Sequence, residues 1–213
     1  MSRTLLATLT ALLLLIPSAT PASLPSAKTP LVKDSVKDLF KGHGYIHILN
    51  TDDISAASMK DAIGCLNEHG MFTRSDCAVF TRADAWPNTL STSAGVCTFQ
   101  NHDMPENLAS WYGKGSYAFS CEGGEALRAE LKDPYYTVQG FSQPFVCNGN
   151  FGCHFEVPGL PDDDGTALPV WEFFWGSHQM GVTPGHVKTM WLWEPVNAIQ
   201  AVDGPKRRVA KTF

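Results

Sequence analysis

Residues 145–157, with the sequence FVCNGNFGCHFEV, hold the residue types best suited to chemistry. Cys147 and Cys153 lie six positions apart around Asn148-Gly149, and His154 follows directly. Thiolate and imidazole groups bind zinc, a free thiol can act as a nucleophile or redox centre, and two cysteines in an oxidising compartment form a disulfide. A zinc site normally has a second Cys or His cluster, which is missing here, whereas Asn-Gly favours a tight hairpin turn. The sequence therefore predicts a hairpin closed by a disulfide.

Four tryptophans form the candidate binding residues. Rings aligned on one face of a strand can stack on sugar rings, but they can equally fill a core or an interface, which is the commoner use of large aromatic side chains. We keep both interpretations. The four residues are Trp171 and Trp175, on a strand expected over 170–175, and Trp191 and Trp193, on a strand expected over 187–193.

Carboxylates and histidines define the alternative of a secreted hydrolase. A glycosidase needs a pair of carboxyl groups, and a ribonuclease needs a histidine acid-base pair with a cation for the phosphate. No Gly-x-Ser-x-Gly elbow, His-Glu-x-x-His helix or phosphate-binding Gly-rich loop is present, and we assign no catalytic residue. The groups considered are Glu156, Glu172, Glu194, His47, His102 and His186, with Arg74 and Arg82 flanking Cys77.

The acidic run Asp162-Asp163-Asp164 could attract calcium, because hard cations take several carboxylate oxygens. It lacks the alternating spacing and the distal glutamate of a calcium-binding loop, and Pro161 and Pro169 flank it. A solvated turn is the favoured interpretation. We expect neither a metal nor a cofactor.

The amino-terminal sequence predicts secretion. Arg3 is followed by a dozen mostly apolar residues and by small residues up to Ala22, which is the pattern of a cleaved signal peptide. Six cysteines follow, and an even number on an oxidising route predicts three disulfides. We expect sequence neighbours to pair, most firmly Cys147 with Cys153. The six are Cys65, Cys77, Cys97, Cys121, Cys147 and Cys153.

The strands, turns and helices expected around these residues predict a β-rich α+β fold. About eight short strands, mostly antiparallel, alternate with turn-rich spacers, and helices are expected over 54–66 and 124–131. The expected organisation is a signal peptide (1–22), a flexible segment or pro-region (23–41), one disulfide-bonded domain (42–197) and a basic flexible tail (198–213). Lobes over 42–133 and 134–197 are possible within the domain.

Charge and hydropathy restrict the partners. The formal net charge is -5 and the pI is near 5.7, so the broad basic face typical of nucleic-acid binding is not expected. Only Lys206-Arg207-Arg208 is strongly basic, and it is interpreted as a solvated end, with a dibasic processing site as the alternative. No segment after the signal peptide is long and apolar enough to span a membrane, and we expect a monomer.

The segment from Asp76 to Cys121 resembles small cysteine-rich secreted proteins of filamentous fungi. The run Asp76-Cys77, Trp86, Leu90-Ser91 and Gly95-Val96-Cys97-Thr98-Phe99 is similar to the necrosis-inducing, Ecp2-like effector family. The resemblance implies a role outside the cell, against a host, and carries no catalytic residues. The function expected is therefore a non-catalytic effector or virulence factor that binds a host protein or a cell-wall glycan, with the secreted hydrolase as the alternative.

Overall fold

The computed structural model describes residues 39–122, 133–149, 153–162 and 165–196. The chain divides into two units, Met1–Leu31 and Val32–Phe213, and every described residue lies in the second. The expected signal peptide, nearly all of the segment 23–41, the expected helix 124–131 and the basic tail lie outside the described residues.

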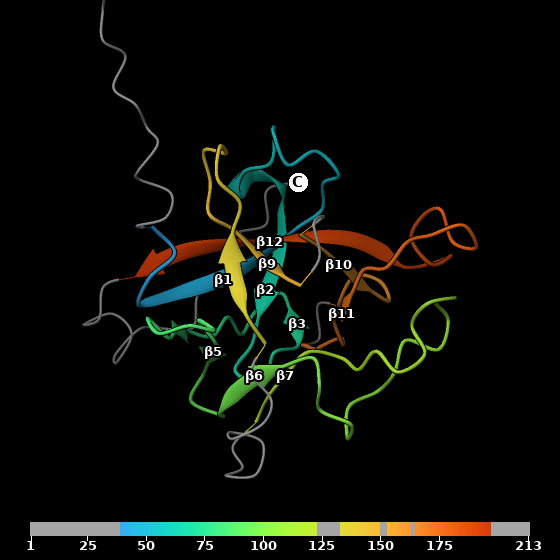
Figure 1. Ribbon diagram of the computed structural model, residues 1–213, viewed down its shortest axis with the longest axis horizontal. Coiled ribbons are helices and arrows are strands. Elements are labelled where there is room, and N and C mark those ends of the chain that lie inside the picture. The colour runs from blue at the N-terminus through green and yellow to red at the C-terminus, as the bar shows by residue number, and fades with distance from the viewer. Residues whose placement is uncertain (1–38, 123–132, 150–152, 163–164, 197–213) are drawn as a thin grey trace, which may run out of the picture. The chain divides into compact units, whose positions relative to one another are not determined.

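Within the described residues, twelve strands form one sheet in which every pairing between strands is antiparallel (Figure 1). The main path runs β11-β10-β12-β1-β4-β5-β6-β7; β2 and β3 branch from β1, and β9 and β8 branch from β12. The strands are β1 (His43–Leu49), β2 (Ala62–Leu66), β3 (Phe72–Thr73), β4 (Phe80–Arg82), β5 (Leu90–Ser91), β6 (Val96–Thr98), β7 (Ser120–Glu122), β8 (Tyr135–Thr137), β9 (Phe145–Asn148), β10 (His154–Val157), β11 (Trp171–Glu172) and β12 (Val187–Val196).

The central strand β12 explains the dense apolar sequence near its middle. It pairs with β1 over seven residues, and also with β9 and β10. Successive side chains of a strand point to opposite faces, and here both faces are covered. Trp191 and Trp193 lie in one buried cluster, whereas Met190 and Leu192 lie in a second. A strand that is buried on both faces has no need for alternating polar residues.

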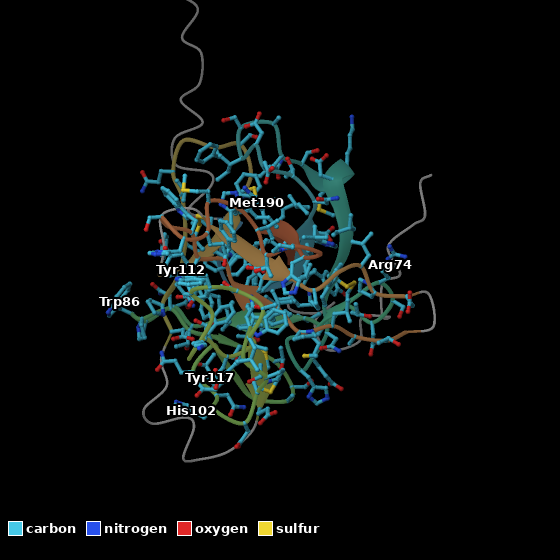
Figure 2. All side chains as sticks on the ribbon, turned by 90° about the vertical axis from the view of Figure 1, so that its right-hand side faces the viewer. Arg74, Trp86, His102, Tyr112, Tyr117 and Met190 are labelled. Atoms are coloured by element: carbon cyan, nitrogen blue, oxygen red, sulfur yellow. A yellow bond between two sulfur atoms is a disulfide. The ribbon has the colours of Figure 1, made fainter. Side chains whose placement is uncertain are left out.

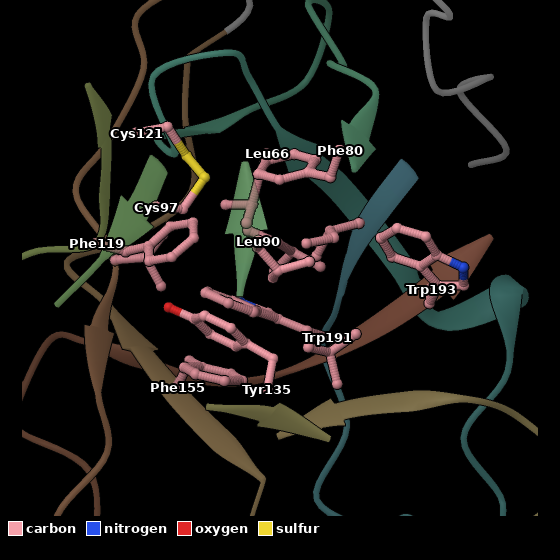
Figure 3. Close-up of a cluster of buried hydrophobic side chains, with 14 of the residues drawn as sticks. Leu66, Phe80, Leu90, Cys97, Phe119, Cys121, Tyr135, Phe155, Trp191 and Trp193 are labelled. Carbon is pink, nitrogen blue, oxygen red and sulfur yellow. A yellow bond between two sulfur atoms is a disulfide. The ribbon is translucent and has the colours of Figure 1, made fainter. Parts of the chain in front are cut away.

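Trp191 lies within a cluster of aromatic rings in the larger core (Figure 3). Its ring stacks on Phe155 at 3.7 Å between centroids and an interplanar angle of 11°, and Phe119 lies 4.9 Å away. Such pairs add to the burial of large apolar area, so this cluster holds β10 and β12 to the loop that precedes β7. The neighbouring Phe99 is 6.0 Å from the same ring.

The predicted α+β class is wrong, because the described residues contain twelve strands, no α-helix and a single 3-10 turn, η2 (Met59–Asp61). The segment 54–66 was expected to be a helix. Ser58 does form a capping box with Asp61, but it caps only that one turn. Residues Ala62–Leu66 instead form β2, which pairs with β1 and β3. Pairing with two neighbouring strands outweighs a helical spacing of apolar residues.

The prediction that neighbouring cysteines pair is confirmed. The disulfides are Cys65–Cys77, Cys97–Cys121 and Cys147–Cys153. The second directly joins paired residues of β6 and β7, and the third joins the end of β9 to the start of β10. The disulfide Cys147–Cys153 forms as predicted, but the predicted hairpin is wrong: β9 and β10 do not pair with each other and instead pair one after the other with β12. Residues 150–152 between them lie outside the described residues.

Candidate binding surface

Three of the four candidate tryptophans are buried. Trp191 and Trp193 are at most 1% exposed, and Trp171 is 6% exposed and donates its indole N–H to the carbonyl oxygen of Pro105 at 2.9 Å. These rings follow the core interpretation and have no open face for a ligand. Trp175, in contrast, is 69% exposed. The structure does not bring the four together on one surface.

Exposed apolar side chains concentrate instead on two loops that are far apart in the sequence. The first loop, residues 107–113, precedes β7, and the second, residues 174–180, lies between β11 and β12. We call these fourteen residues the two-loop surface. Its large exposed side chains are Leu108 (72%), Trp111 (64%), Trp175 (69%) and Met180 (76%).

Gln179 ties the two loops together. Its side-chain oxygen accepts hydrogen bonds from the backbone N–H of Trp111 at 2.6 Å and from the hydroxyl of Ser110 at 3.0 Å. Its backbone also exchanges two hydrogen bonds with Gly176, at 2.9 and 3.0 Å, which closes the second loop on itself. One amide side chain thus fixes the second loop against the first.

A second link joins Tyr112 to the second loop. The backbone N–H of His178 donates to the Tyr112 hydroxyl at 3.0 Å. The same oxygen lies 2.4 Å from the position that a Cβ atom on Gly176 would occupy, closer than real side chains approach. Position 176 must therefore be glycine for the tyrosine to lie where it does.

The ring of Trp111 is held by His178. The two rings are parallel to within 5°, with centroids 5.0 Å apart, and the hydroxyl of Ser177 lies 3.1 Å from Nδ1 of His178. Because Trp111 remains 64% exposed, the face of its ring away from the imidazole is open to solvent. The arrangement presents a flat indole on a fixed support.

The two-loop surface carries no formal charge. Residues 107–113 and 174–180 contain no Asp, Glu, Lys or Arg, in a chain of which 17% of residues are charged. The polar groups between the apolar side chains are hydroxyls, amides and one imidazole. They belong to Asn107, Ser110, Tyr112, Ser177, His178 and Gln179.

Sequence reasoning did not select Leu108, Trp111 and Met180. Their segments lack the alternation of a strand and the spacing of a helix, so they were treated as spacers. The available signal was the presence of large apolar side chains among Gly, Ser and Asn, outside any predicted strand or helix. Side chains of that kind have no strand or helix to bury them.

The histidines considered for catalysis lie in separate places. His47 bonds to Glu194 at 2.8 Å, and His186 bonds through Nδ1 to the fully buried Glu156 at 2.6 Å. His102 stacks on Tyr117, with centroids 4.5 Å apart (Figure 2). His47 therefore faces neither of the carboxylates, Glu156 or Glu172, with which a catalytic pair was considered.

Glu172, another carboxyl group considered for catalysis, is partly buried. Burial, reinforced by the negative charge of Asp133, raises the pKa of Glu172 to about 7. Asp133 itself accepts hydrogen bonds from the Thr98 hydroxyl, at 2.9 Å, and from the Phe99 N–H, at 2.7 Å. Asp133 is thus a structural hydrogen-bond acceptor for the end of β6. Its carboxylate is therefore not free to act with Glu172 as a catalytic pair.

Across the described parts of the chain, no three His, Cys, Asp or Glu side chains gather as a metal would require. Asp162, the only described member of the acidic run, is exposed. A search for helices in the same residues finds none that is long and apolar enough to cross a membrane.

No family model, curated protein or solved structure matches this chain.

Proposed function

We propose that this chain is a secreted, non-catalytic protein that binds a host component outside the cell, in the manner of a fungal effector, and that the two-loop surface is its contact. The observation that carries the proposal is the exposure of Leu108, Trp111, Trp175 and Met180 on two mutually fixed loops. Large exposed apolar side chains that gather in one region mark interaction sites, and tryptophan is enriched among residues that dominate binding energy.

Preorganisation also supports a binding role. Loops that are already held by Gln179 and Tyr112 lose little conformational entropy when a partner binds. An exposed Trp111 supported by His178 has the same advantage at the level of one side chain. Fixing these side chains before contact favours binding, whereas chemistry would call for converging acid and base groups.

Secretion is supported by the cysteines. All three disulfides are formed and the described residues contain no free cysteine, a state compatible with an oxidising compartment. The signal-peptide pattern at the amino terminus agrees with this assignment.

One observation favours the alternative, a secreted hydrolase. Glu156 is buried and bonds to Nδ1 of His186, which is how a carboxylate orients a histidine base. That imidazole also stacks on the ring of Trp171, but among the described side chains no hydrogen bond or ion pair joins it to a nucleophile or to a second acid. The binding function is therefore the stronger proposal.

The decisive experiment is infiltration of the secreted protein into plant leaf tissue, with polysaccharides and RNA tested in parallel as substrates. We expect cell death without substrate turnover, and we expect the Trp111→Ala variant to cause less cell death. Trp86→Ala is the matched control, because Trp86 is 77% exposed but lies between β4 and β5 and belongs to neither loop. Substrate turnover that is lost in His186→Ala would establish the hydrolase instead. The absence of both cell death and turnover would refute the effector role.

A further inference from the structure

We infer that the two-loop surface binds an uncharged polysaccharide, with pyranose rings lying on the indoles of Trp111 and Trp175. The inference rests on the proposed binding function and specifies its ligand. It follows from three properties of the described side chains: the presentation of the rings, the polar groups between them and the absence of charge.

The rings are presented as flat, open faces. Trp111 is 64% exposed with one face against His178, and Trp175 is 69% exposed. A pyranose ring has an apolar face of C–H groups, which gains dispersion and weak C–H to π contacts on an indole face. Because both tryptophans lie on loops joined by Gln179, the backbone segments that carry them are held together, as a repeating ligand requires.

The groups around the rings match sugar hydroxyls. Ser177 and His178 are exposed and offer hydroxyl and imidazole groups on the second loop, and each can donate or accept a hydrogen bond. Sugar hydroxyls have the same dual capacity. The Ser177 hydroxyl and Nδ1 of His178 already bond to each other, but an apolar partner would bury their remaining hydrogen-bonding capacity unused, which costs free energy.

The absence of charge selects a neutral ligand. Nucleic acids and acidic polysaccharides are bound through Lys and Arg, and neither residue occurs within 107–113 or 174–180. The neighbours of the first loop carry opposite charges, Glu106 before it and the exposed Lys114 after it, and the Glu106 carboxylate accepts a hydrogen bond from the N–H of Gly115. A neutral chain of sugars requires no charged partner on the two loops.

The test is affinity electrophoresis of the full secreted chain in gels containing soluble neutral polysaccharides, namely xylan, hydroxyethyl cellulose, glycol chitin and a β-1,3-glucan. Polygalacturonate is the anionic comparison. We expect retardation by at least one neutral polysaccharide and little by polygalacturonate. Trp111→Ala and Trp175→Ala should each weaken binding by about tenfold, the effect of losing one stacked ring.

Two variants serve as controls. Trp111→Phe keeps an aromatic face and should bind between wild type and Trp111→Ala, whereas Trp86→Ala should bind as wild type. Circular dichroism of each variant excludes misfolding as the cause of any loss. Retention of full affinity in both Trp111→Ala and Trp175→Ala would overturn the inference, as would retardation by polygalacturonate alone.

Failure of this inference is distinguishable from failure of the proposed function. If no neutral polysaccharide retards the protein but leaf cell death still depends on Trp111, the ligand is not a glycan. The ligand is then a protein partner, for which Leu108 and Met180 would be contacts. If the protein neither causes cell death nor binds any of these ligands, the binding function itself is refuted.

Discussion

Glu172 couples the protonation of one carboxyl group to the stability of the fold. Its pKa is raised from 4.5 to about 7, first by burial and then by Asp133. The folded protein therefore binds this proton more tightly than the unfolded chain does. The stability that the protonated side chain contributes is fully present below pH 4.5 and is lost as the pH rises through about 7.

Replacement of Glu172 by Gln should remove this dependence. We expect Glu172→Gln to raise the free energy of unfolding at pH 8 by about 1–3 kcal/mol and to change it little at pH 4, since a shift of one pKa unit corresponds to about 1.4 kcal/mol. Urea unfolding at pH 4, 6 and 8 measures the effect. Asp103→Asn, which removes an exposed carboxylate, controls for net charge. Equal destabilisation of Glu172→Gln at all three pH values would contradict the burial argument.

For single residues, the sequence indicates tryptophans as candidate binding residues, but it does not show which tryptophans are exposed. Trp191 and Trp175 both lie in aromatic, β-branched runs, yet one is fully buried and the other is 69% exposed. The difference arises because the strand around Trp171 ends at Glu172, three residues before Trp175. Strand length is decided by pairing partners, which a single segment does not reveal.

The two loops form an element-level unit whose geometry depends on Gly176. Because a Cβ atom there would lie 2.4 Å from the Tyr112 hydroxyl oxygen, we expect Gly176→Ala to displace that ring and break the bond from the His178 N–H. Gly181→Ala is the matched control, since nothing lies within 4 Å of a Cβ atom at that position.

The measurement is amide hydrogen exchange of residues 107–113 and 174–180. Gly176→Ala should raise exchange rates in both loops at least several-fold, with little change in β1 and β12, whereas Gly181→Ala should leave all four segments near wild type. Faster exchange confined to the second loop would mean that the loops are not coupled, and it would weaken the argument for a single surface.

Elements were predicted well where the local pattern and the sheet agree. The hydrophobic runs before Asn50 and after Val187 form β1 and β12 as predicted, whereas Asn148, predicted to begin a hairpin turn, is the last residue of β9 and pairs with Tyr135 of β8. The helix predicted over 54–66 is wrong because Ile54, Met59 and Ile63 have helical spacing, while the strands that pair with Ala62–Leu66 lie elsewhere in the chain. Long-range pairing is the information that the local sequence lacks.

For the whole molecule, the disulfides should contribute in the order of the loops they close. The separations are 6 residues for Cys147–Cys153, 12 for Cys65–Cys77 and 24 for Cys97–Cys121. Loop-closure entropy gives about 2.4, 2.9 and 3.5 kcal/mol in that order. We therefore expect paired Cys→Ser replacements to lower the urea midpoint least at Cys147/Cys153 and most at Cys97/Cys121. The reverse order would show that native packing, not chain entropy, decides their effect.

The position of β12 has a consequence for the order in which the protein can assemble. A ribosome releases β1 early, but β1 finds its seven-residue partner only when β12, the last of the twelve strands, has emerged. All three disulfides join cysteines that precede β12. Oxidation can thus be complete while the middle of the sheet still lacks β12. A chain stalled before Val187 would be fully cross-linked, yet Ile46 and Ile48 would lack the strand that pairs with them and completes their core.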